Sequence, residues 1–263
     1  MFDYHLHSEW SFDSKDSIQS FAEKAAHAGI QEICFTEHIE PYNNYGLDWD
    51  GFIDFNAYSA EIERVRGLFP GLVIRRGLEL GLEESARPAI LRYLTGKSID
   101  FLIASQHFIQ GSDPYFPQYF AGKTKRESEE TYLHCLLNCL KGFDAFCVVG
   151  HIGYVSKHAP YNSPLVYLDY PDLLDEILKT IIDGGKGIEI NTSSYSVYNE
   201  PMPTPGIIRR FLELGGEIIT IGSDAHTKDR AGDHFNEALA LLHGLGAKYI
   251  CTFENLSPVF HKI

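Results

Sequence analysis

Short runs of β-branched and aromatic residues alternate with longer stretches of helical spacing from one end of the chain to the other. This alternation is typical of repeated βα units around a parallel sheet. Seven runs predict strands, and an eighth run, at 248–253, has a weaker pattern. The seven are 2–7, 32–37, 72–80, 100–108, 145–151, 187–192 and 217–223.

Helix signals lie between these runs. Asp16 or Ser17 can cap a helix that stops at Gly29, and Thr204 followed by Pro205 can open one that stops at Gly215. Further helices are predicted at 54–68, 125–140, 171–182 and 231–243. No Gly/Ser-rich or Pro-rich linker divides the chain, and 263 residues is an ordinary size for a one-domain α/β barrel. We therefore expect a TIM-like barrel in a single domain over residues 1–263.

Two connections are longer than a βα loop needs, at 39–55 and 109–123. Both follow a predicted strand and are rich in aromatic residues, namely Tyr42, Tyr45, Trp49, Tyr115, Phe116, Tyr119 and Phe120. Long ordered loops are often functional, so these could form walls or a lid over a site. The alternative is that their rings only pad the rim of the barrel.

The formal net charge of -14 repels polyanions, and no stripe of Lys or Arg could neutralise a run of phosphates. A long nucleic acid is therefore not an expected partner. The five cysteines are scattered through apolar segments without a paired CxxC motif, which indicates free thiols in a reducing compartment. No apolar run approaches the ~20 residues of a membrane span, and no signal peptide is recognisable. We expect a cytoplasmic protein that does not bind membranes; its oligomeric state is not predicted.

The first predicted strand contains two histidines in alternate positions. Side chains alternate along a strand, so His5 and His7 project from the same face and could bind one metal ion. Such a pair is weak evidence alone, because histidines on a polar strand face are often merely hydrogen-bonded.

Later strands also end in residue types that bind metals. They supply His38, Glu79, His107, His151, Asp224 and His226. In a closed parallel barrel the carboxyl ends of the strands converge on one face, where barrel enzymes keep their active sites. Structural histidines scattered through the fold would have no reason to lie at that edge.

With Asp13 on the first loop, the candidate metal ligands are six histidines and three carboxylates. This number exceeds the roughly four to six ligands that one ion needs, so two or three divalent ions are implied. Imidazole and carboxylate without thiolate suit Zn, Mn, Fe or Co. Adjacent metal ions favour hydrolysis of a phosphate ester, and neither a GxSxG elbow nor a GxxxxGK[ST] loop indicates another chemistry.

At these residues the chain resembles the PHP (polymerase and histidinol phosphatase) family and, within it, the stand-alone histidinol-phosphate phosphatases. The resemblance extends from His5 to about Asn255. Its motifs are His5-Leu6-His7-Ser8, Thr36-Glu37-His38, Gly77-Leu78-Glu79, Ser105-Gln106-His107-Phe108, Gly150-His151, Glu189-Ile190-Asn191-Thr192 and Gly222-Ser223-Asp224-Ala225-His226.

The resemblance implies a distorted (β/α)7 barrel with a trinuclear metal site. By the family pattern one metal is held by His5, His7, Glu79 and Asp224, a second by Asp13, His38 and His226, and a third by His107 and His151, with Glu79 bridging. Asp13 stands where some relatives have a histidine, which keeps the capacity to bind a metal. The catalytic residues implied are Asp224, Glu79 and His226.

The activity implied is metal-dependent hydrolysis of a small phosphate monoester, L-histidinol phosphate, to L-histidinol and phosphate in histidine biosynthesis. The long aromatic loops are similar to those of histidinol phosphatases. These enzymes usually carry a basic residue shortly after the Asn-Thr-Ser of strand six, where this chain has Ser194-Tyr195-Ser196. The candidate substrate contacts are Lys157, His158 and Arg230, although each could simply be a solvated side chain.

Two other functions remain open from the sequence. One is a PHP phosphoesterase that acts on a nucleotide or another small phosphate ester or diester. The other is a non-catalytic metal-binding regulatory module, which would not need to retain nine ligands.

Overall fold

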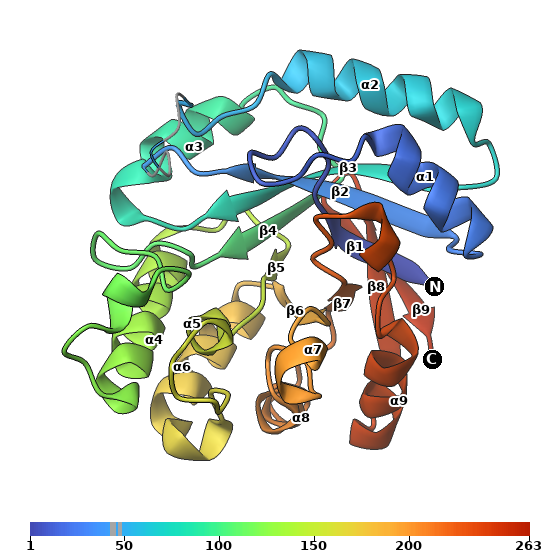
Figure 1. The fold of residues 1–263 in the computed structure, drawn as a ribbon. Coiled ribbons are helices and arrows are strands. Elements are labelled where there is room, and N and C mark those ends of the chain that lie inside the picture. Colours follow the sequence, from blue (N-terminus) through green and yellow to red (C-terminus); the bar gives the residue numbers. More distant parts are fainter. Residues whose placement is uncertain (43–45, 47–48) are drawn as a thin grey trace.

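The computed structural model describes residues 1–42, 46 and 49–263, and its centre is a sheet of seven parallel strands (Figure 1). The strands are β1 (Phe2–Leu6), β2 (Glu32–Ile39), β3 (Val73–Gly81), β4 (Phe101–Ser105), β5 (Val148–Val149), β6 (Gly187–Asn191) and β7 (Ile219–Gly222). They pair in the order in which they occur in the chain. Sequential parallel pairing with a helical crossover each time is the topology of a βα barrel.

The wall of the barrel closes between β1 and β7. Leu6 forms a parallel bridge with Ala225, just beyond β7, and the N–H of His7 donates to the carbonyl of Ala225 at 3.0 Å. The contact is brief, so the barrel is nearly closed and distorted at this seam. The predicted distorted (β/α)7 barrel is confirmed.

Helices flank the outside of the sheet (Figure 1). They are α1 (Ile18–His27), α2 (Phe55–Leu68), α3 (Arg87–Leu94), α4 (Lys125–Gly142), α5 (Tyr154–Lys157), α6 (Pro171–Asp183), α7 (Tyr195–Tyr198), α8 (Pro205–Glu213) and α9 (Phe235–Leu245). Ser17 is the residue that caps α1, since its side chain accepts from the N–H of Ser20 at 3.2 Å. A capping box of Thr124 and Glu127 opens α4, which explains why the polar sequence at 125–130 begins a helix.

Among the described α-helices and strands, four were not predicted, namely the short helices α5 and α7, the helix α3 and the strand β9. α3 buries only Ile90 among its residues, and Leu91 faces solvent, so the apolar spacing that predicts a helix is missing. β9 (Ser257–Lys262) is mostly exposed, and it pairs antiparallel with β8 (Tyr249–Glu254). The weak run at 248–253 is therefore a strand, but it lies outside the seven-stranded wall.

The β8–β9 hairpin covers the end of the barrel where the strands begin. The Tyr4 hydroxyl accepts from the N–H of Phe253 at 2.8 Å, and the N–H of Leu256 donates to the carbonyl of Asp100, one residue before β4, at 2.9 Å. The rings of Phe101 and Phe253 lie 5.0 Å apart in the core. Because the hairpin fills this end, the carboxyl ends of the strands are the open face.

In the loop over 109–123, some aromatic residues pack into the fold and others border the cavity. Tyr119 and Phe120 are buried and pad the fold, whereas Tyr115 and Phe116 are 57% and 41% exposed. In the loop over 39–55, Trp49 lies beside Phe12. Tyr45 lies outside the described residues.

The cysteines are free thiols, and Cys34, Cys139, Cys147 and Cys251 are buried. Burial raises the pKa of Cys147 to about 11, so this thiol stays protonated and behaves as a small apolar side chain. Among the described helices, none combines the length and apolarity that crossing a bilayer requires.

Candidate functional site

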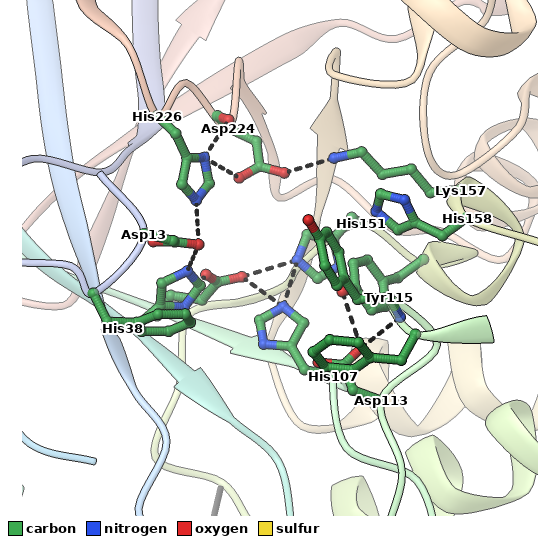
Figure 2. Close-up of a pocket in the computed structure, with 14 residues that line it drawn as sticks. Asp13, His38, His107, Asp113, Tyr115, His151, Lys157, His158, Asp224 and His226 are labelled. Carbon is green, nitrogen blue, oxygen red and sulfur yellow. Dashed lines mark hydrogen bonds and ion pairs between the residues drawn. The ribbon is translucent and has the colours of Figure 1, made fainter. Parts of the chain in front are cut away.

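The nine predicted ligands come together at the carboxyl ends of the strands. Seven of them line a cavity of about 520 Å³, namely Asp13, His38, Glu79, His107, His151, Asp224 and His226. His5 and His7 lie beneath the cavity and are completely buried. Figure 2 shows Asp13 and His38 on one side of the pocket, with His226 and Asp224 above them and His107 below.

Glu79, at the end of β3, is the centre of the cluster. Its two carboxylate oxygens contact imidazoles from four different strand ends. Oε2 lies 3.3 Å from His5 Nε2, 3.4 Å from His7 Nε2 and 3.1 Å from His38 Nδ1, and Oε1 lies 2.8 Å from His151 Nε2 and 3.4 Å from His107 Nε2. Glu79 can therefore bridge more than one ion.

Two other carboxylates face the same imidazoles. Asp224 Oδ1 lies 3.7 Å from His5 Nε2 and 3.6 Å from His7 Nε2. Asp13 Oδ2 lies 3.0 Å from His226 Nε2 and 3.5 Å from His38 Nε2. Asp224 Oδ1 also lies 3.7 Å from His226 Nδ1, so His226 stands between the two acids.

The cluster contains three groups of residues, and within each group the ligand atoms lie within 4.8 Å of one another. The groups are His5, His7 and Asp224; His7, His38 and His226; and His38, Glu79 and His107. The groups share His7 and His38, so they form one continuous cluster. Such overlap is what several neighbouring ions would need, and it agrees only in part with the grouping that the family pattern implies.

Two of the predicted ligands have strained backbones. Asp224 has φ +54° and His151 has φ +22°, a region that residues other than glycine rarely adopt. Strain of this kind persists where the surrounding structure holds it and is concentrated at functional sites. Both strained residues lie where the chain leaves a strand and turns toward the cavity.

Buried glutamates hold the imidazoles from behind. His5 Nδ1 lies 2.5 Å from Glu189 Oε1, and His107 Nδ1 lies 2.6 Å from Glu40 Oε1. A carboxylate that accepts from Nδ1–H fixes the tautomer in which the Nε2 lone pair faces the cluster. Both histidines are therefore oriented to coordinate through Nε2.

His7 is held in place by the hydroxyl group of Ser11 and not directly by a carboxylate. Its Nδ1 lies 3.0 Å from Ser11 Oγ, which donates to Glu37 Oε2 at 2.5 Å. The backbone N–H of Ser8 also donates to Glu37, at 3.1 Å. Burial, only partly offset by the Ser11 and Ser8 hydrogen bonds, raises the pKa of Glu37 to about 7.

Gly222 leaves room for the contact between Glu189 and His5. A methyl group on its Cα would collide with the carboxylate of Glu189 and with the Cβ of His5. The glycine that precedes Ser223 and Asp224 is therefore required by close packing, because any side chain would push β7 away from the seam with β1.

The surroundings lower the pKa of both Glu79 and His7. Burial alone would raise the pKa of Glu79, but the imidazoles of His5 and His107 outweigh it and hold that pKa well below its usual range. Burial lowers the pKa of His7 to about 3, helped by the neighbouring His38. His7 is therefore a neutral imidazole whose Nε2 lone pair is available for a cation.

The predicted substrate contacts divide into two sets. Lys157 and His158 line the cavity, and Lys157 Nζ lies 2.8 Å from Ser193 Oγ and 3.4 Å from Asp224 Oδ2. Arg230 instead pairs with Asp233 at 3.2 Å on the half-exposed η4 turn (Lys228–Arg230) and is not part of the cavity lining. The structure therefore brings Lys157 and His158, but not Arg230, to the site.

Several residues of the site were not predicted from the sequence. Glu40 and Glu189 support the histidines, while Asp113, Tyr154 and Phe12 line the cavity. A signal existed for Glu40, which directly follows β2 and lies two residues after His38, the spacing that places His5 and His7 together. Asp113 lies in the loop at 109–123, where the sequence pattern draws attention to the aromatic residues and not to this carboxylate.

The chain matches the PHP domain family profile over residues 3–193. Histidinol-phosphatase of Lactococcus lactis subsp. lactis is 30% identical over 257 residues, which covers 97% of this chain and 94% of the relative. A probable histidinol-phosphatase of Clostridium acetobutylicum is 33% identical over 269 residues, covering 100% of this chain and 97% of the relative.

Solved structures show the same fold. Histidinol phosphate phosphatase from Lactococcus lactis, complexed with Zn, L-histidinol and phosphate, superposes with a TM-score of 0.90 and 28% identity and covers 98% of both chains. A putative histidinol phosphatase from Listeria monocytogenes has a TM-score of 0.74 at 18% identity, covering 90% of this chain and 99% of that one.

Proposed function

The chain belongs to the PHP domain family, and we propose that it is a metal-dependent phosphomonoesterase that hydrolyses L-histidinol phosphate to L-histidinol and phosphate. The observation that carries the proposal is the meeting of imidazoles from separate strand ends around one carboxylate, Glu79. The complex of the Lactococcus lactis relative with Zn, L-histidinol and phosphate supports the choice of substrate.

Two buried imidazole nitrogens without hydrogen-bond partners indicate that the cluster fits metal ions. The Nε2 atoms of His5 and His7 are buried and have no hydrogen-bond partner among the described residues. Buried polar atoms are normally paired, because an unpaired one costs roughly 1–3 kcal/mol. Both atoms face Glu79 and Asp224, so a divalent cation at that point would be coordinated by all four residues.

The proposed metal ligands are the nine residues of the cluster. They are His5, His7, Asp13, His38, Glu79, His107, His151, Asp224 and His226. Two or three ions fit this number, and Zn, Mn, Fe or Co fits the donor types. When bound, divalent ions would supply an activated water and neutralise the charge of the phosphate oxygens.

The chain's own residues orient this chemistry. Glu189 and Glu40 fix the tautomers of His5 and His107, and Ser11 fixes His7. Lys157 Nζ lies at the wall of the cavity beside Asp224, where it can donate to a phosphate oxygen. Glu79, Asp224 and His226 are the proposed catalytic residues, because they surround the space that the phosphate would occupy.

The test is an assay of phosphate release with purified protein loaded in turn with Zn, Mn, Fe and Co. We expect turnover of L-histidinol phosphate, loss of that turnover on chelation, and slower cleavage of other phosphorylated metabolites. Faster cleavage of bis-p-nitrophenyl phosphate than of any monoester would overturn the assignment in favour of a diesterase. An inert protein with every ion would indicate a regulatory metal-binding module.

A further inference from the structure

Asp113 places a carboxyl group in the wall of the cavity, away from the histidine cluster. Its side chain is buried, and the residue is 3% exposed. The Oδ1 atom accepts from the N–H of Tyr115 at 2.8 Å and from the Tyr154 hydroxyl at 3.2 Å. These contacts hold the carboxyl group in a defined orientation. In Figure 2, Asp113 lies across the pocket from Asp13 and His226.

Tyr154 sets the distance between Asp113 and the cluster. Its ring packs against His107 and His151, with centroids 5.0 Å and 5.2 Å apart, and its hydroxyl reaches Asp113. The carboxyl group is therefore about one tyrosine side chain away from the metal-binding histidines. A small molecule with a phosphate at one end and a positive charge a few bonds away would span this separation.

Aromatic rings border the cavity next to Asp113. Tyr115 and Phe116 are both well exposed and both line the cavity, and the Tyr115 ring lies 4.8 Å from that of His158. Exposed aromatic side chains beside a cavity often mark a binding surface. These rings offer flat apolar faces that suit an aromatic group of a ligand.

We infer that Asp113 is a specificity residue that binds the ammonium group of the substrate, while the rings of Tyr115 and Phe116 contact its imidazole. This inference rests on the proposed function, since it assigns the other end of the same substrate. The phosphate end would then lie beside Lys157 and Asp224, which line the same cavity 3.4 Å apart.

The ammonium group is the appropriate partner for chemical reasons. An imidazole has a pKa near 6.5 and is largely neutral at pH 7, whereas a primary amine stays protonated. A hydrogen bond between an ionised carboxylate and an ammonium group is about twice as strong as a neutral one. The buried carboxyl group therefore favours substrates with an amine and disfavours neutral or acidic alcohol phosphates.

The experiment compares wild type with Asp113→Asn on three substrates. These are L-histidinol phosphate, its analogue without the amino group, and p-nitrophenyl phosphate. Asparagine keeps the oxygen that accepts from Tyr115 and Tyr154, so the fold of the loop is retained. We expect KM for L-histidinol phosphate to rise at least tenfold, and KM for the two substrates without an amine to change less than twofold.

A binding measurement accompanies the kinetics. L-Histidinol is used as an inhibitor of p-nitrophenyl phosphate hydrolysis, and its inhibition constant is expected to rise at least tenfold in Asp113→Asn, with that of inorganic phosphate unchanged. The control is Asp169→Asn, which removes a half-exposed carboxyl group outside the cavity and is expected to match wild type.

Each remaining outcome overturns the inference. An equal loss with the analogue that lacks the amine would show that Asp113 does not bind the ammonium group, and an equal loss with p-nitrophenyl phosphate would show general damage to the site. Unchanged constants would show that Asp113 does not contact the substrate. If wild type turns over p-nitrophenyl phosphate but not L-histidinol phosphate, the proposed function itself fails, which is a separate result.

Discussion

Glu79 Oε1 lies 2.8 Å from His151 Nε2, although 72 residues separate the two in the chain. Glu79 lies near the carboxyl end of β3 and His151 follows β5, so the strand β4 stands between them in the sheet. Only the curvature of a barrel brings side chains from such strands to a common point. This one contact therefore links the fold to the proposed metal centre.

Glu79→Gln is expected to lower the metal content and reduce kcat by about 100-fold or more, because it removes the charge that bridges the proposed ions. Folding is expected to persist, since the substitution keeps the size and shape of the side chain. Metal analysis, kcat and circular dichroism measure the three effects. Glu130→Gln, at a half-exposed carboxyl group on α4, is the control. A variant with full metal content and full activity would remove Glu79 from the site.

Glu189→Gln tests the support of His5 from behind. The hydrogen bond from His5 Nδ1 to a charged carboxylate becomes a weaker one to an amide, and the tautomer of His5 is less strongly fixed. We expect metal affinity to fall roughly 10- to 100-fold, with activity restored at high metal concentration. Competition with a chelator measures the affinity. Activity that excess metal does not restore would contradict a role through His5.

Tyr4→Phe tests the junction between the barrel and the hairpin. The variant leaves the buried N–H of Phe253 without the hydroxyl that accepts from it, which costs roughly 1–3 kcal/mol of the free energy of unfolding. Urea denaturation measures the loss. Because Tyr4 lies at the end of the barrel opposite the cavity, KM is expected to stay at the wild-type value. Equal stability would mean that the hairpin is held by other contacts.

The ion pair of Asp175 with Arg210 predicts a dependence of stability on pH. Hydrogen bonds from Arg210 hold the pKa of Asp175 below its usual value of 3.8, even though burial opposes the shift. A lowered pKa stabilises the fold above the unfolded value and ceases to do so as the pH falls through the folded value. Asp175→Asn is therefore expected to be less stable than wild type at pH 7, with the difference shrinking below about pH 4. Urea midpoints over this range measure it, and a difference independent of pH would exclude the charge as its cause.

The strand ends and the proposed ligands could be predicted because they follow local rules. Alternation along a strand places His5 beside His7, and the geometry of a parallel barrel brings strand ends together. The supporting carboxylates could not be recognised in the same way. Glu189 belongs to a motif of the family resemblance, but no local rule indicates that its carboxylate lies 2.5 Å from His5, which is 184 residues away.

Asp113 and β9 were not predicted for the same kind of reason. The function of Asp113 depends on Tyr154 and on the cavity between them, and neither leaves a mark in the spacing of residues near 113. β9 has exposed apolar residues such as Val259 and Phe260, so its pattern lacks the one-sided polarity that identifies a half-buried strand. Tertiary contacts decide both cases.

The ring of Phe2 lies 4.4 Å from that of His261, so the two termini lie together at the end of the barrel that the hairpin covers. The cavity mouth is at the other end. A tag, a linker or a fused enzyme attached at either terminus would project away from the mouth. The chain can therefore be immobilised or fused from either end while small molecules still reach the histidines.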